Sequence, residues 1–134
     1  MTPRDVWQRF DDEVSDRLLR GMAAAFALVA TADVDIAEEE VQRFLQLVRE
    51  EPSLRRVDPD AIEPLFRELA QALMDEPDVG RPRALEIVRE SRRHGELIVA
   101  AAQMAIVADS HLVNVEELAL REICEALGLD PSTH

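Results

Sequence analysis

Apolar residues recur at the three- and four-residue spacing of a helix along almost the whole chain. The residues Val41, Phe44, Leu45 and Val48 show the pattern clearly, because their side chains fall on one face of a helix. No stretch of five or more residues alternates between apolar and polar in the manner of a half-buried strand. The sequence therefore predicts an all-α fold, a compact bundle of about six or seven helices.

Prolines, caps and the extent of each apolar face predict where the helices lie. The first begins near Pro3, is amphipathic as far as Gly21, and continues into the apolar run Met22–Ala32, which we expect at the centre of the bundle. The others are predicted at about Ile36–Glu50, Pro59–Met74, Arg81–Arg93, Glu96–Asp109 and Asn114–Leu127. His94 is expected to be a cation at the end of the fourth helix, and Gly95 its left-handed C-cap.

A length of 134 residues is typical of a single domain, so we expect residues 1–134 to share one core. Trp7 is expected to be a core or interface anchor. Cys124 lies among apolar residues and is expected at a buried helical position. As the single cysteine it cannot form an internal disulfide, which favours a reducing compartment.

The chain contains an internal repeat. Shifting the sequence by 76 residues aligns Ala23–Glu51 with Val99–Leu127, and both segments show the same predicted helix-turn-helix boundary. The identical pairs include Ala24 with Ala100, Ala25 with Ala101, Ala32 with Ala108, Asp33 with Asp109, and Glu40 with Glu116. The repeat predicts two helical hairpins related by a pseudo-twofold axis, because that packing would bury both apolar faces.

The charge balance is strongly acidic. Twenty-eight acidic against fifteen basic side chains, all of them Arg, give a net charge of −13. Such a field repels nucleic acid and anionic membrane surfaces and favours cations or basic protein surfaces. The apolar runs are shorter than the roughly 20 residues that a spanning helix needs, and no signal-peptide pattern is visible. We therefore expect a cytoplasmic protein.

Two related turns, Ala32–Glu40 and Ala108–Glu116, carry an Ala-Asp pair followed by a Glu seven residues after the Asp. With the closing segment Ile123–Pro131, they resemble the TerB tellurite-resistance family, which is related to the N-terminal region of membrane-anchored DnaJ-like co-chaperones. Val34 and Ser110 stand where that family has glycine. The turns are therefore expected to differ in shape from the family's pattern.

The resemblance implies a helical protein of the tellurite-resistance and stress-response system. It also implies TerC-type membrane proteins and TerD-type proteins as partners, which would bring the chain to the inner membrane only indirectly. The His-Pro-Asp signature of a J-domain is missing, so co-chaperone activity is not expected. Phosphate loops, nucleophile elbows and two-His metal motifs are also missing from the sequence, which argues against an enzyme.

The acidic turns suggest a metal site. Asp33, Asp35 and Glu40 could supply oxygen ligands for a hard divalent cation such as Ca²⁺, Mg²⁺ or Mn²⁺, and Asp109 with Glu116 could contribute from the second turn. The spacing of seven from Asp to Glu is too short for an EF-hand loop. The sequence therefore predicts a module that binds a divalent cation, outside the EF-hand class.

A structural explanation of the same residues stays open. Carboxylates in the first turn of a helix are stabilised by the helix dipole, so Glu38, Glu39 and Glu40 do not require a metal. Asp33 and Asp109 each close an apolar helix at its C-terminal end, where an anion needs a cation or a donor beside it. The alternative function is therefore a metal-free helical adaptor that binds a basic protein surface.

Overall fold

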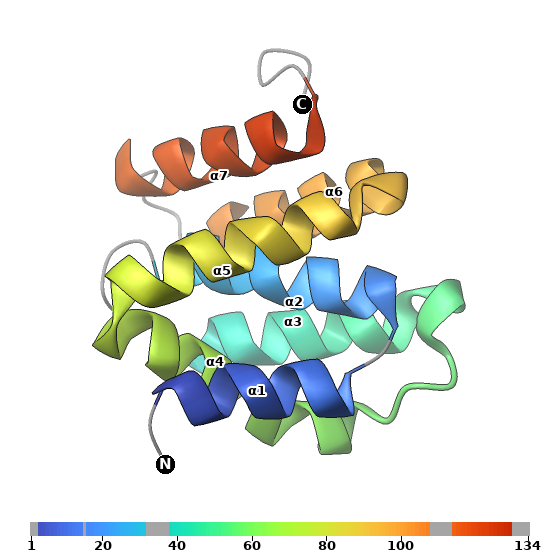
Figure 1. Ribbon diagram of the computed structural model, residues 1–134. Coiled ribbons are helices and arrows are strands. Elements are labelled where there is room, and N and C mark those ends of the chain that lie inside the picture. The colour runs from blue at the N-terminus through green and yellow to red at the C-terminus, as the bar shows by residue number, and fades with distance from the viewer. Residues whose placement is uncertain (1–2, 15, 32–37, 108–113, 130–134) are drawn as a thin grey trace.

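The computed structural model describes residues 3–14, 16–31, 38–107 and 114–129, and within these ranges it contains helices and no strand. Figure 1 shows the helices stacked into one bundle. The elements are α1 (Pro3–Glu13), α2 (Arg17–Ala30), α3 (Glu38–Glu50), η1 (Pro52–Leu54), α4 (Pro59–Asp75), α5 (Pro77–Glu90), η2 (Arg92–His94), α6 (Gly95–Val107) and α7 (Asn114–Leu127). The predicted all-α fold is confirmed.

Helix α2 is the central helix of the bundle. From Gly21 to Ala30 every residue is buried, and the helix packs against α3, α4, α5, α6 and α7 (Figure 1). A helix that is apolar on all sides is stable only when other elements surround it. The prediction that the apolar run beginning at Met22 enters the centre of the bundle is therefore confirmed.

The prediction of one continuous first helix is wrong, because α1 ends at Glu13 and α2 begins at Arg17. Between them Asp16 has an extended backbone, and its carboxylate accepts a hydrogen bond from the Leu19 amide at 3.1 Å. Arg20 closes the corner by donating to the Val14 carbonyl at 2.9 Å. Asp16 is therefore the N-cap of a new helix, because its carboxylate pairs with an amide that has no partner within the helix. The helical spacing of apolar residues continues across this break and does not reveal it.

The fourth predicted helix also needs correction. It begins at Pro77, four residues before the predicted start, because proline at the first helical position has no amide that needs a partner. It ends at Glu90, and His94 lies in the separate short helix η2, not in a last turn of α5. Gly95 is right-handed, with φ −51°, and opens α6, so the predicted left-handed cap is wrong. The glycine with a positive φ, 72°, is Gly128.

An aromatic cluster lies in the core where α2, α3 and α4 meet. The rings of Phe44 and Phe66 stack with centroids 4.2 Å apart, and Phe26 packs at an angle against both. Trp7 and Cys124 are buried, as predicted. These contacts bind the N-terminal half of the bundle together.

The two helices that open the repeats, α2 and α6, pack against each other. This contact is compatible with the predicted pair of hairpins, but the internal duplication and its pseudo-twofold axis remain predictions. No described helix is both long and apolar enough to cross a membrane.

Candidate functional site

Among the five predicted metal ligands, Glu40 is the one whose side chain the structure describes. Asp33, Asp35 and Asp109 lie outside the described residues, and so does the side chain of Glu116. Glu40 lies in the first turn of α3 and is only 6% exposed. Among the described residues it is the one acidic side chain that is buried.

The C-terminal end of α2 is also buried. Thr31 is 9% exposed, and its hydroxyl donates to the Ala27 carbonyl at 2.7 Å. The Thr31 amide donates to the same carbonyl at 3.0 Å. Thr31 and Glu40, on the two sides of residues 32–37 in the sequence, are therefore both buried.

The three adjacent glutamates that open α3 occupy different environments. Glu38 forms a two-pronged ion pair with Arg67 of α4, with N–O distances of 2.8 and 2.6 Å. The hydrogen bonds from Arg67 and then from Gln42 lower the pKa of Glu38 to about 2. Glu39 is exposed and Glu40 is buried. The acidic run is therefore not a uniform cluster of ligands.

Within the part of the chain that the structure describes, no three carboxylate, imidazole or thiol groups come close enough to hold a metal ion. Four of the predicted ligands fall outside that description, so the metal hypothesis remains a prediction. What can be placed is a buried carboxylate, Glu40, at the start of α3.

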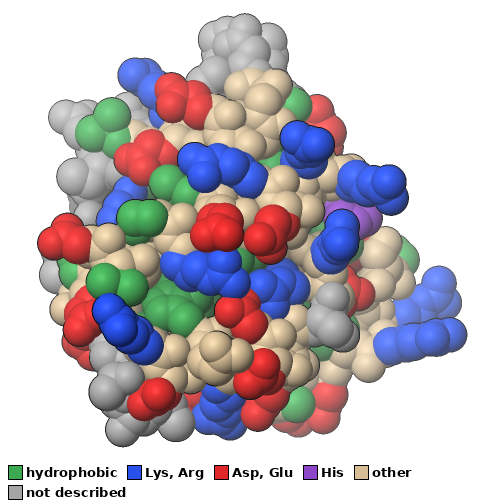
Figure 2. Space-filling model, in the orientation of Figure 1, with side chains coloured by type: hydrophobic (Ala, Val, Ile, Leu, Met, Phe, Trp, Pro, Cys, Tyr) green, Lys and Arg blue, Asp and Glu red, His purple; other side chains and the backbone are tan. Residues whose placement is uncertain are grey.

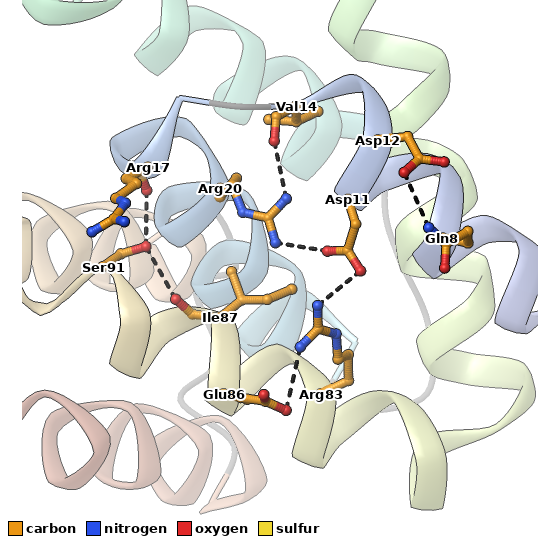
Figure 3. Close-up of polar contacts among 10 residues, drawn as sticks. All are labelled: Gln8, Asp11, Asp12, Val14, Arg17, Arg20, Arg83, Glu86, Ile87 and Ser91. Atoms are coloured by element: carbon orange, nitrogen blue, oxygen red, sulfur yellow. Dashed lines mark hydrogen bonds and ion pairs between the residues drawn. The ribbon is translucent and has the colours of Figure 1, made fainter.

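A second charged region lies where α1, α2 and α5 meet (Figure 3). The Asp11 carboxylate lies between two guanidinium groups, 2.7 Å from Arg20 and 2.8 Å from Arg83. Burial raises the pKa of Asp11, but the hydrogen bonds from Arg20 and Arg83 outweigh that effect and the net pKa is lowered. The Arg20 guanidinium also lies 5.1 Å from the centre of the Phe10 ring. These contacts fasten α5 to the corner between α1 and α2.

A cavity of about 780 Å³ opens beside this corner. Arginine dominates its lining, which we call the arginine cleft. Its residues are Asp11, Val14, Arg17, Arg20, Arg83, Arg89, Glu90, Ser91, Arg92 and Arg93. Figure 2 shows basic side chains gathered around the carboxyl end of α5 on this face. This cleft was not predicted from the sequence, where the short basic segment at the end of α5 is its local signal.

The fold and these two charged regions define the class of protein. It is a small all-helical bundle in which the candidate binding residues are charged side chains near helix ends. The family model for tellurite resistance protein TerB matches residues 19–134. The chain therefore belongs to the TerB family, as the repeated Ala-Asp turns predicted. Neither the curated proteins nor the solved structures compared with the chain gave a match. The relation to DnaJ-like co-chaperones remains a prediction.

Proposed function

We propose that this chain is a non-catalytic module of tellurite resistance and stress response that binds a divalent cation at its first acidic turn. Asp33, Asp35 and Glu40 would supply the oxygen ligands, and Asp109 and Glu116 would form a weaker second site. TerC-type and TerD-type proteins would be its partners, bringing a cytoplasmic protein to the inner membrane. Family membership supports the link to tellurite resistance.

The observation that carries the proposal is the burial of Glu40. A carboxylate removed from water is costly unless positive charge or hydrogen-bond donors compensate it. A hard cation held by carboxylate oxygens would compensate the cost of burying a carboxylate and would also explain why acidic residues crowd this turn. The net charge of −13 further favours a cation as ligand.

Calorimetric titration with Ca²⁺, Mg²⁺ and Mn²⁺ tests the proposal, together with urea unfolding in the presence of each ion. At an ion concentration of about 100 times the Kd, binding to the folded state adds about 2.7 kcal/mol to the free energy of unfolding. The double substitution Asp33→Asn with Glu40→Gln should abolish that gain. Asp109→Asn with Glu116→Gln should reduce it less.

The matched control is Asp60→Asn with Glu125→Gln, which removes the same charge from two exposed positions. The control should keep the ion-dependent stabilisation. If the parent chain shows no heat and no stabilisation at millimolar metal, the metal proposal is wrong. The metal-free adaptor for a basic protein surface would then be the remaining function.

A further inference from the structure

The arginine cleft has a charge opposite to that of the whole chain. Its lining contains six arginines and two carboxylates, a formal charge of +4, in a protein with a net charge of −13. Six of the fifteen basic side chains therefore line one cavity. A concave surface with charge of one sign focuses the field and concentrates ions of the opposite sign.

Four of the six arginines have no ion-pair partner among the described residues. Asp11 holds Arg20 and Arg83, and Glu86 also contacts Arg83. The arginines without such a partner are exposed, and they are Arg17, Arg89, Arg92 and Arg93. Their guanidinium groups are available to a ligand without breaking a contact that holds the helices together.

Helix dipoles explain only part of this arrangement. Arg89 lies in the last turn of α5, and Arg92 and Arg93 follow it, where the negative end of a helix favours cations. Arg17 is the first residue of α2, where the positive end of the helix disfavours a cation. Placing Arg17 beside three other cations adds repulsion, which a bound anion would relieve.

The floor of the cleft is a close and fixed contact between α2 and the end of α5. The Ser91 hydroxyl is buried and lies 2.9 Å from the Arg17 carbonyl and 3.0 Å from the Ile87 carbonyl (Figure 3). A Cβ on Gly21 would lie only 2.8 Å from the Ser91 Cβ, so glycine permits this approach. The backbones that carry Arg17 and Arg92 are therefore preorganised, which lowers the entropic cost of binding.

We propose that the arginine cleft binds a small anion carrying two or more phosphate groups. A guanidinium fork matches phosphate oxygens in a bidentate manner. One phosphate monoester carries about 1.5 to 2 negative charges at neutral pH, so two such groups balance the formal +4 of the lining. The volume of about 780 Å³ lies within the range of small-molecule sites. No aromatic ring is among the described lining residues, so the phosphates, not a base, carry the recognition.

Part of this site lies outside the segment that matches the TerB family. Asp11, Val14 and Arg17 precede Leu19, where the family match begins. Helix α1 and the start of α2 thus complete a cleft whose other wall lies within the matched segment. The lining of the cleft contains none of the residues proposed to bind a cation, so neither proposal depends on the other.

Isothermal titration with inorganic pyrophosphate tests the proposal, with inorganic phosphate, ADP and AMP for comparison. Pyrophosphate should bind at least roughly tenfold more tightly than phosphate, because it engages more guanidinium groups. Its affinity should fall as salt is raised, since screening weakens exposed charges. Equal binding of ADP and pyrophosphate would identify nucleotides as one source of the diphosphate group. Tighter binding of pyrophosphate would identify inorganic polyphosphate.

The key variant is Arg17→Gln with Arg92→Gln, which should weaken pyrophosphate at least roughly tenfold. Its matched control is Arg49→Gln with Arg56→Gln, which has the same net charge and changes two exposed arginines outside the cleft. The control should keep its affinity, and circular dichroism should show both variants folded. An equal loss in both variants, no pyrophosphate binding at low salt, or binding only to vesicles containing phosphatidylglycerol would overturn the proposal.

Discussion

The first turn of α3 and the arginine cleft differ in the sign and in the arrangement of their charged side chains. In the turn, Glu38 has its own arginine, Glu39 faces solvent, and Glu40 is buried, so three adjacent carboxylates have three environments. In the cleft, one of the two carboxylates, that of Asp11, bridges two guanidinium groups, and four more arginines line the same cavity. A net charge of −13 therefore does not describe the local field that a ligand would meet.

The two regions also depend on different contacts. Helix α3 is held against α4 by the aromatic cluster, while Glu38 and Arg67 pair at the exposed surface. The cleft is held by the close approach of α2 and α5 at Gly21 and by the Asp11 network. A change in one set of contacts should therefore leave the other region intact.

The largest effect is expected from Gly21→Ala. The new Cβ would lie 2.6 Å from Ile98 Cδ1 and 2.8 Å from Ser91 Cβ, so α2 and α5 must separate. Overpacking of this kind costs about 1–3 kcal/mol in the free energy of unfolding. Urea unfolding should show that loss, and pyrophosphate binding should weaken while ion-dependent stabilisation persists.

Gly95→Ala is the control for this prediction. Its Cβ would reach Leu129 Cδ1 at 3.4 Å, which is a tolerable contact. Alanine favours a helix over glycine by about 1 kcal/mol, so this variant should be as stable as the parent or slightly more stable. A Gly21→Ala protein as stable as Gly95→Ala would show that the approach of α2 to α5 is not tight.

A smaller effect is expected from Asp11→Asn. The substitution removes the carboxylate that Arg20 and Arg83 share, and should cost about 1–2 kcal/mol at pH 7. The pKa of Asp11 is lowered in the folded state, so its contribution is complete above the unfolded pKa and is lost as the pH falls through the folded value. The difference between parent and variant should therefore shrink below about pH 4.

Asp12→Asn provides the matched comparison, because Asp12 is exposed and accepts only an exposed hydrogen bond from Gln8. Its unfolding curve should lie close to that of the parent chain at pH 7. If Asp11→Asn showed the same curve as Asp12→Asn, the Asp11 network would not hold α5 to the corner.

The fold was predictable wherever local signals and the apolar period agree. The predicted bounds of α3, α4, α6 and α7 match the structure to within two residues, because prolines and changes in polarity mark their ends. The break at Asp16 was missed because Val14, Leu18 and Met22 keep the helical period across it. There the hydrogen bond from the Leu19 amide decides the structure, and periodicity does not report it.

The candidate sites show a different limit. The acidic turns were found because their ligands would lie within eight residues of one another along the chain. The arginine cleft was not found, because Arg17 and Arg92 come from distant segments and only the packing of α2 against α5 joins them. The burial of Glu40 could not be predicted from the sequence either, because Glu38 and Glu39 beside it are exposed and only the tertiary structure makes the difference.

The smallest effect on stability is expected from Glu38→Gln, in the first turn of α3. The pKa of Glu38 is lowered to about 2 by Arg67 and Gln42, yet its side chain is 62% exposed. Solvent screens an exposed pair and weakens both its effect on the pKa and its contribution to stability, so unfolding of Glu38→Gln should nearly match the parent chain.

The lowered pKa itself should still be measurable. An NMR titration should place the pKa of the Glu38 carboxyl below the ordinary glutamate value of about 4.3 in the parent chain, and Arg67→Gln should raise it toward that value. Whatever stability the pair contributes is present above the unfolded pKa and is lost as the pH falls toward 2. A large loss of stability in Glu38→Gln would mean that this pair, like the Asp11 network, holds two helices together, and the contrast between the two regions would disappear.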